Sequence, residues 1–309
     1  MRSPEAGNGT AHRPSRLSWL LLIVPMLWGL GYPLIRSSMD EIGALPFLVY
    51  RFGVALVPLL IVLRASLRGL DRAVWCHGIL MGVALAAAYG SLNVGLTYTT
   101  TVKAGFIIGL RVVLIPMLVA VLLPGSIRAR TWMAALLSTA GLAIIFLGTE
   151  SSWASVNRGD VMMALSALAF AVHVLLIGRL SRPDAVQAQL LIQIGVVTVL
   201  GGLLTAAIDG LAVPTSRVAW MHLATTGVLS TALALWLQTR YQPAVPAERA
   251  GIIYSSEPLF AAFFGFLYLG ERLVGWQWLG ALLILAAMLL AQWPAVRRAF
   301  IHRAHAFGH

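Results

Sequence analysis

The chain contains 309 residues, of which 59% are hydrophobic and only 11% are charged, and its mean hydropathy is +0.86. Soluble domains carry about a quarter charged residues, so this composition indicates a membrane protein with several spanning segments. The formal charge is +11, but the basic residues fall mostly in short loops rather than in a stripe with aromatic residues, which argues against nucleic acid as a partner. Cys76 is the single cysteine, so an intramolecular disulfide and a cysteine metal cluster are excluded.

Ten apolar segments are long enough to cross a bilayer as helices, each of roughly 20 residues. Their approximate bounds are 17–36, 44–64, 73–98, 102–123, 131–148, 159–179, 186–208, 217–239, 247–269 and 275–293. The first run is too long for the core of a signal peptide, so we expect it to be retained as a spanning helix. Residues 1–16 and 294–309 are expected to be polar cytoplasmic tails.

The arginines predict the orientation in the membrane. With the N-terminus inside, 14 of the 22 basic residues fall in inner loops and tails and five on the outer side, while Arg51, Arg111 and Arg249 lie within helices or at their start. Loops on the cytoplasmic side carry the excess of Lys and Arg, so both termini are predicted to be cytoplasmic. The composition, rich in Ala, Leu and Arg and nearly free of Lys, favours a bacterial inner membrane.

An internal duplication relates two segments, 101–132 and the stretch that opens at Pro246. A shift of 146 positions pairs Lys103 with Arg249, Ala104 with Ala250, Gly105 with Gly251, Leu123 with Leu269 and Trp132 with Trp278. The same shift places Arg111 on Glu257, so two intramembrane charges occupy corresponding positions. Charges at that depth are costly and usually mark function.

The duplication has a geometric consequence. Segments four and five correspond to segments nine and ten, so the repeats 17–148 and 159–293 hold five crossings each. An odd number of crossings inserts the second repeat upside down relative to the first. Inverted repeats are typical of secondary transporters, whose substrate site lies near the midplane between the repeats. The predicted fold is therefore all-α, with ten transmembrane helices in two inverted five-helix repeats.

Short motifs follow one another in a characteristic order along almost the whole chain. They are Trp28-Gly29, Arg51-Phe52, Thr101 to Gly105, Gly159-Asp160, Pro246 to Ala250, Glu257-Pro258 and Gly270-Glu271-Arg272 with Gln277 and Gly280. With these motifs the chain resembles a ten-helix member of the drug/metabolite transporter superfamily, of the EamA type. It departs from that pattern at Pro124-Gly125-Ser126, where the family often has Gly-Glu-Arg, which puts in doubt a charged outer cap in both repeats.

Arg111 and Glu257 are predicted to be in contact, because a pseudo-twofold axis between segments four and nine brings equivalent positions together. One interpretation is a structural pair or gate that specifies geometry rather than stability. The other is direct contact with substrate or with a transported proton, which makes Glu257 the candidate for proton coupling.

Further residues are candidates for a substrate cavity. Arg51 could bind a carboxylate or phosphate through its planar fork, although the alternative of a snorkelling or capping arginine is favoured near a helix end. Trp28 and Tyr32 share a helix face, as do Tyr89 and Asn93 four residues apart. The full set of candidates is Trp28, Tyr32, Arg51, Tyr89, Asn93, Arg111, Tyr254 and Glu257. The histidines lack ligand spacing, so no metal site and no cofactor are predicted.

The expected function is secondary transport, as an exporter of small metabolites such as amino acids, by alternating access and with proton coupling through Glu257. No G-x-x-x-x-G-K-[ST] motif occurs, so transport is expected to use an ion or substrate gradient. The alternatives are a sugar-phosphate or nucleotide-sugar exchanger of the same superfamily, and a lipid flippase. An intramembrane enzyme is disfavoured because the catalytic motifs are missing. The partners expected are the bilayer and a small-molecule substrate; the oligomeric state stays open, with a monomer favoured.

Overall fold

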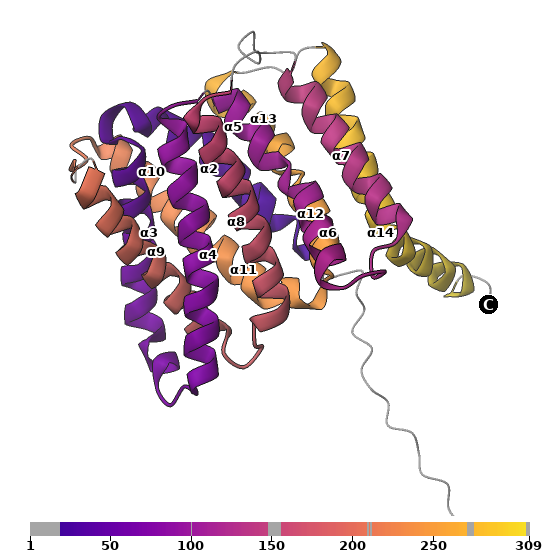
Figure 1. The fold of residues 1–309 in the computed structure, drawn as a ribbon, viewed down its shortest axis with the longest axis horizontal. Coiled ribbons are helices and arrows are strands. Elements are labelled where there is room, and N and C mark those ends of the chain that lie inside the picture. Colours follow the sequence, from indigo (N-terminus) through magenta and orange to yellow (C-terminus); the bar gives the residue numbers. More distant parts are fainter. Residues whose placement is uncertain are drawn as a thin grey trace, which may run out of the picture.

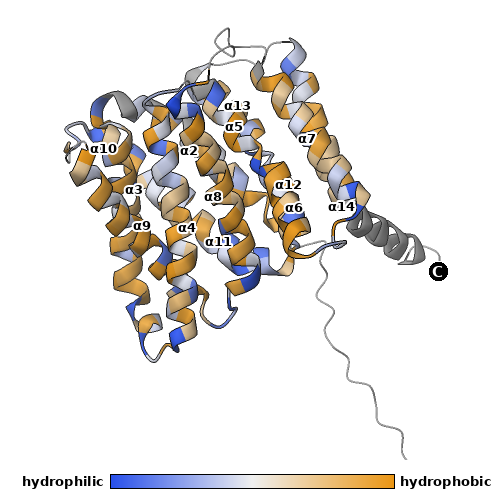
Figure 2. Cartoon of the chain, viewed as in Figure 1, coloured by the Kyte–Doolittle hydropathy of each residue, from blue (hydrophilic) through white to orange (hydrophobic). Residues whose placement is uncertain are grey.

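The computed structural model describes residues 19–99, 101–147, 156–208, 210, 212–270 and 275–306. These residues form helices and turns without any strand, in agreement with the all-α prediction. The helices lie side by side as one bundle (Figure 1), and apolar residues predominate along the length of most of them (Figure 2).

The first half of the chain contains α2 (Ile23–Ile42), α3 (Ala44–Leu63), η1 (Arg64–Leu67), α4 (Arg72–Leu96), α5 (Thr101–Gly109), α6 (Arg111–Leu122) and α7 (Ala129–Leu147). The second half contains α8 (Arg158–Leu180), α9 (Val186–Ile208), α10 (Arg217–Thr225), η3 (Thr226–Leu233), α11 (Ala234–Tyr241), η4 (Gln242–Ala244), α12 (Ala247–Tyr254), α13 (Glu257–Leu269) and α14 (Gly275–Ala306). We call the end where α5 and α10 begin the upper end, and the end where α12 begins the lower end, as in Figure 1.

Eight of these helical stretches, within the described residues, are long and apolar enough to cross a membrane. Two shorter apolar helices, Ile23–Ile35 and Gly275–Ala291, occupy the places of the first and tenth predicted segments. The described residues thus form a helical membrane protein with several crossings.

Three predicted segments are interrupted rather than continuous. Segment 102–123 breaks at Leu110, between α5 and α6, and segment 247–269 breaks at Ser255 and Ser256, between α12 and α13. Pro258 accounts for the second break, because it has no N–H to donate to the carbonyl of Tyr254 and restricts the residue before it. The first break has no proline at the matching position, and the sequence does not explain it.

The third interruption lies in segment 217–239. Residues Thr226–Leu233 form a π-helix, η3, which links α10 to α11. Stretches of π-helix are rare and are frequent at functional sites. Gly227 lies where a Cβ would come within 2.9 Å of the carbonyl oxygen of Arg51. The missing side chain therefore lets α3 approach the backbone of η3 closely.

Other glycines also set the distances between helices. A Cβ on Gly78 or Gly82 would meet Ile192 and Val196 of α9, and one on Gly105 would meet Phe146 of α7. Gly78, Gly82 and Gly105 therefore let helices of the same chain pack closely together. In α7 and α14 the contact is reciprocal, since a Cβ on Gly141 or on Gly280 would lie 2.6 Å from the carbonyl oxygen of the other glycine.

Polar side chains define the helix ends. Asp71 caps α4 by accepting from the Val74 N–H at 2.8 Å. Asn157 and Asp160 form a capping box at the start of α8. Asp160 also accepts from the Thr99 hydroxyl at 2.5 Å and from Lys103 Nζ at 3.2 Å. One buried carboxylate thus ties the junction of α4 and α5 to α8.

Candidate functional site

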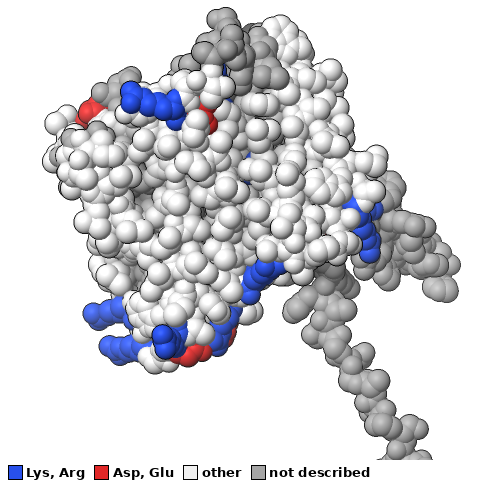
Figure 3. Space-filling model, viewed as in Figure 1, with Lys and Arg blue, Asp and Glu red and all other residues white. Residues whose placement is uncertain are grey.

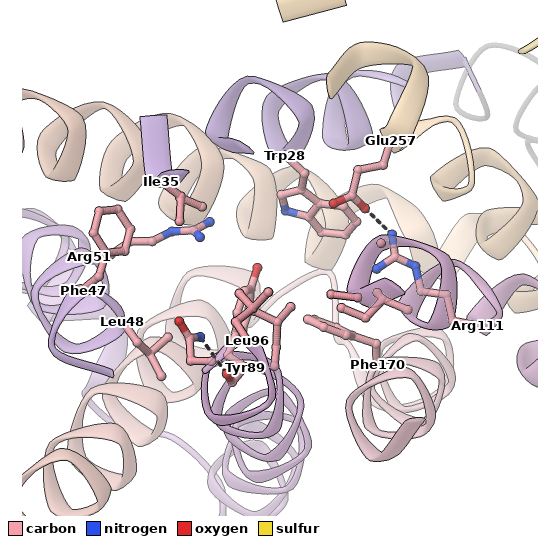
Figure 4. Close-up of a pocket in the computed structure, with 15 residues that line it drawn as sticks. Trp28, Ile35, Phe47, Leu48, Arg51, Tyr89, Leu96, Arg111, Phe170 and Glu257 are labelled. Carbon is pink, nitrogen blue, oxygen red and sulfur yellow. Dashed lines mark hydrogen bonds and ion pairs between the residues drawn. The ribbon is translucent and has the colours of Figure 1, made fainter. Parts of the chain in front are cut away.

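A cavity of about 120 Å³ lies among α2, α3, α4, α5, α6, α8 and α13 (Figure 4). Its lining residues are Trp28, Ile35, Phe47, Leu48, Arg51, Tyr89, Leu92, Asn93, Leu96, Ala104, Gly105, Ile108, Arg111, Phe170 and Glu257. Leu96 ends α4 and Ala104 lies near the start of α5. The cavity therefore extends from the helix breaks toward the upper end of the bundle.

The predicted pair of charges is present at one side of this cavity. Arg111 Nη2 donates to Glu257 Oε2, and both residues are 7% exposed. Each is the first residue of a half-helix, Arg111 of α6 and Glu257 of α13. A helix start favours an anion and disfavours a cation. The negative charge of Glu257 is therefore favoured at its helix start, whereas the positive charge of Arg111 is disfavoured at its own. The ion pair with Glu257 compensates the charge of Arg111.

Aromatic rings surround the guanidinium of Arg111. The ring centroids of Trp28 and Phe170 lie 5.6 Å and 5.5 Å from its Cζ. In Figure 4 the indole of Trp28 lies next to the Arg111–Glu257 pair. The ring of Tyr89 also makes edge-on contacts with Phe52 and Phe170. Its centroid lies 5.2 Å from that of Phe52 and 5.1 Å from that of Phe170. Cation–π and aromatic contacts thus hold both the pair and the wall of the cavity.

Arg51 lies on the opposite side of the cavity and is 6% exposed. Its Nε donates to the Thr231 hydroxyl at 2.7 Å and its Nη2 to the Ser230 carbonyl at 3.2 Å. Both partners belong to the π-helix η3. Snorkelling does not fit this residue, because its guanidinium stays inside the bundle. The bond to the Ser230 carbonyl does fit the predicted alternative of an arginine that caps a backbone carbonyl.

Six of the eight residues predicted for the cavity line it: Trp28, Arg51, Tyr89, Asn93, Arg111 and Glu257. The side chain of Tyr32 lies outside the described residues. Tyr254 is fully buried and is not among the residues that line the cavity. Its hydroxyl donates to Gln242 Oε1 at 3.2 Å, and its ring packs on Trp28 at 5.3 Å.

Gln242 organises a buried polar cluster between the cavity and the lower end. It accepts from Tyr254 and from Gln238 Nε2, the latter at 3.1 Å, and it donates to the Val174 carbonyl at 2.5 Å. Gln238 and Gln242 are both buried. Helices α8, α11 and α12 are therefore linked on the lower side of the cavity.

Sequence reasoning missed several lining residues. Phe47, Leu48 and Phe170 are apolar side chains in apolar segments, and no pattern separates a cavity wall from a packed core. The tie between Lys103 and Asp160 had a signal, since opposite charges stand at the starts of the fourth and sixth predicted segments, which both begin on the same predicted side of the membrane. Among the described residues, no cluster of three His, Cys, Asp or Glu side chains is placed to hold a metal. His173 bonds Gln193 across α8 and α9 at 2.9 Å.

The model of the EamA-like transporter family matches this chain twice, over residues 16–147 and 157–293. The chain belongs to the EamA-like transporter family. Membership points to a transporter rather than an enzyme, and the two matches meet at the cavity, since Arg111 lies in the first and Glu257 in the second.

Individual relatives of this EamA-family protein agree with that assignment. An uncharacterized transporter of Archaeoglobus fulgidus is 28% identical over 273 residues, covering 87% of this chain and 83% of the relative. The uncharacterized transporter YwfM of Bacillus subtilis is 24% identical over 282 residues, covering 88% and 92%. A crystal structure with 18% identity superposes with a TM-score of 0.75 over 92% of this chain and 98% of the other, which shows a shared fold.

Proposed function

We propose that the protein is a secondary active transporter that exports small metabolites such as amino acids by alternating access. The observation that carries the proposal is a cavity with buried charged walls that takes side chains from both family matches. Buried charges facing a cavity inside a membrane bundle are typical of a substrate pathway. The other cavity residues, Trp28, Tyr89 and Asn93, are assigned to the same site.

The proposal includes ten crossings in two inverted repeats. The helix breaks support it, because Leu110 precedes Arg111 just as Ser256 precedes Glu257, 146 positions later. The close contact between Gly141 and Gly280 also brings α7 next to α14, which are the fifth and tenth helices of this scheme. In this scheme α2 and α14 supply the first and tenth crossings.

The orientation follows from the distribution of charge. Basic side chains gather along the lower edge of the face in Figure 3 and are sparse at its upper edge. The excess of positive charge assigns the lower end to the cytoplasm. Both termini would then be cytoplasmic. The proposal further places the protein in a bacterial inner membrane, as a monomer.

Access to the cavity would alternate between its two sides. The cavity extends toward the upper end, while the Gln242 cluster closes the lower side. This arrangement corresponds to a state that faces outward. Opening toward the cytoplasm requires α8, α11 and α12 to separate, which breaks the hydrogen bonds of Gln242. The bonds are therefore the proposed inner gate.

The size of the cavity favours compact substrates. A volume of about 120 Å³ is below the roughly 300–1,000 Å³ of pockets for larger ligands. It fits an amino acid or a short acid better than a nucleotide sugar. This comparison places metabolite export ahead of nucleotide-sugar exchange.

Proton coupling would pass through Glu257. A carboxylate held in an ion pair has to leave its partner before it takes up a proton, so coupling requires Arg111 and Glu257 to separate during the cycle. Separation of these residues would also change the contact between α6 and α13, which links the proton to movement of the two halves.

Purified protein in liposomes tests the proposal. Counterflow of a panel of labelled amino acids, with and without an imposed pH gradient, should show uptake that the gradient accelerates. The Glu257→Gln variant should retain exchange but lose the acceleration. Equal rates with and without the gradient would remove proton coupling, and absence of counterflow for every member of the panel would contradict small-metabolite transport.

A lateral groove favours lipid translocation as a second candidate. A groove of about 1,070 Å³ opens on the surface between α2, α13 and α14. Phe263, Trp278 and Leu285 line it and are about half exposed. Its walls suit acyl chains, but Ser256 is the one polar residue among those lining it, so a headgroup has little to bind. A dithionite-quenching assay with fluorescent phospholipids in the same liposomes separates the two functions.

A further inference from the structure

Arg51 differs from the other buried cations of the described bundle in the charge of its partners. Lys103 pairs with Asp160 and Arg111 pairs with Glu257. The hydrogen bonds of Arg51 go to a hydroxyl and a carbonyl, both neutral. Within the described residues none of the ion pairs involves Arg51. A buried guanidinium without a carboxylate is costly, and such a cost is typically retained for function.

The fold holds the guanidinium in one position. The hydroxyl of Thr231 accepts from Nε, and the same hydroxyl donates to the Thr226 carbonyl at 3.1 Å. The face of Tyr89 lies 5.5 Å from Arg51 Cζ. In Figure 4 the guanidinium points from the α3 wall toward the middle of the cavity, on the side opposite Glu257. The donors not used by η3 therefore face Tyr89 and the space where a substrate would lie.

The charges that line the cavity do not cancel. Arg111 and Glu257 neutralise each other, and Arg51 leaves one positive charge. We propose that the transported substrate carries an anionic group, such as a carboxylate, and that Arg51 binds it through its planar fork. The inference rests on the proposed transport function and names the substrate class of the same cavity.

The other lining residues indicate the chemical character of the part of the substrate that does not bind Arg51. Ile35, Leu48 and Phe170 are apolar, and Asn93 commits its Nδ2 to the Tyr89 carbonyl at 2.7 Å. Apolar walls bind apolar bodies. The site thus selects a compact apolar body that carries an anionic group, and a net cation of the same size is excluded by repulsion from Arg51.

Three probes with one carbon skeleton test the charge preference. Thermal stability of the purified protein is measured with millimolar 4-methylpentanoate, 4-methylpentanamide or 4-methylpentylamine, since a ligand of the folded state raises its melting temperature. The carboxylate should raise it, and the amide and amine should not. An equal shift with the amide, or no shift with the carboxylate, would overturn the proposal.

Two variants of Arg51 and a matched control assign the effect to this residue. Arg51→Gln should lower the apparent affinity for 4-methylpentanoate at least about tenfold, because the charge and the fork are lost. Arg51→Lys should fall between it and the parent protein, because the charge remains. Arg217→Gln removes an exposed arginine at the start of α10 and should bind normally. Retained binding by Arg51→Gln would refute the assignment.

Two further measurements keep the outcome clear. Without ligand, Arg51→Gln should melt at or above the temperature of the parent, because a buried unpaired charge is removed; a strongly lowered melting temperature would mean a structural arginine. Uptake into liposomes is measured separately with the three probes. Carboxylate-specific binding without uptake would contradict the transport function but support the anion site. Equal uptake of acid and amide would support transport but contradict the anion site.

Discussion

At the scale of single residues, polarity inside the bundle is concentrated in a few bonded groups. Arg111 and Glu257 lie 146 positions apart and meet at the starts of two half-helices. Arg51 instead bonds neutral atoms of η3. The same residue type therefore has two different roles, and the partner rather than the arginine decides which.

The Arg111–Glu257 pair should show strong coupling in a double-mutant cycle. Arg111→Gln or Glu257→Gln alone leaves one buried charge without its partner, so each should cost about 3–5 kcal/mol of unfolding free energy. The double variant should cost clearly less than the sum of the two. Unfolding in detergent micelles measures all four proteins, and additive costs would contradict direct pairing.

Glu41 predicts a pH effect at the upper end. Its carboxylate accepts from the Ser216 hydroxyl at 2.6 Å and from the backbone N–H groups of Ser216 and Thr215 at 2.8 Å each. These hydrogen bonds, that of the Ser216 hydroxyl first, lower the pKa of Glu41 to about 2. A lowered pKa in the folded state means stabilisation that is complete above the ordinary carboxyl pKa and disappears as the pH falls toward 2.

The parent protein should therefore lose melting temperature between about pH 5 and pH 2 more steeply than Glu41→Gln, which has no carboxylate to protonate. Melting curves of both proteins across this range measure the difference. Other carboxylates titrate in the same window, so the prediction concerns the gap between the two curves. Parallel curves would show that the link between α2 and α10 contributes nothing.

At the scale of helices, interruptions and glycines shape the site more than helix propensity does. The α12–α13 break places Glu257 at a helix start, and the π-helix η3 presents Ser230 and Thr231 to Arg51. Gly227 lets these backbones come close. The α12–α13 break lies at a residue that lines the cavity, and η3 bonds another, Arg51, as expected where function competes with regular structure.

Gly280 should tolerate no side chain. A Cβ there would lie 2.6 Å from the Gly141 carbonyl oxygen. That oxygen belongs to the backbone of α7, so it cannot move aside as a flexible side chain could. Gly280→Ala should therefore destabilise the protein by about 1–3 kcal/mol. Gly202→Ala in α9 is the matched control, because its Cβ meets nothing within 4 Å. Unfolding in detergent compares the two, and equal stability would show that α7 and α14 separate without cost.

At the scale of the whole molecule, the two family matches are joined by the cavity rather than merely adjacent in sequence. Arg111 of the first match bonds Glu257 of the second, and Arg51 of the first bonds Thr231 of the second. A relative movement of the halves must therefore break or exchange these contacts. In the proposed transport cycle, this requirement would couple occupancy of the cavity to the conformation of the bundle.

Labelling with a membrane-impermeant maleimide tests the proposed topology. In a Cys76→Ala background, Val213→Cys lies at the upper end and Arg68→Cys in the lower turn before α4, both exposed positions. Intact cells should label the Val213→Cys variant alone, and inverted vesicles the Arg68→Cys variant alone. The reverse result would place the N-terminus outside.

The amino-acid sequence by itself determined the membrane class, the eight long apolar helices and the contact between Arg111 and Glu257. These follow from local hydropathy and from comparison of the chain with itself, and both are properties of linear order. The charge pair was predictable because a shift of 146 places Arg111 on Glu257, and equivalent positions were expected to meet at a pseudo-twofold axis.

The tertiary structure decided which side chains face the cavity, where helices break and what Arg51 bonds. Tyr254 shows why, since it was a cavity candidate as an amphipathic side chain of a predicted helix, whereas its ring packs on Trp28 and its hydroxyl bonds Gln242. Facing depends on the rotation of each helix about its axis, which packing sets. The hydrogen-bond partners of Arg51 are 180 and 179 residues away in the sequence. No local sequence pattern predicts a contact between residues so far apart.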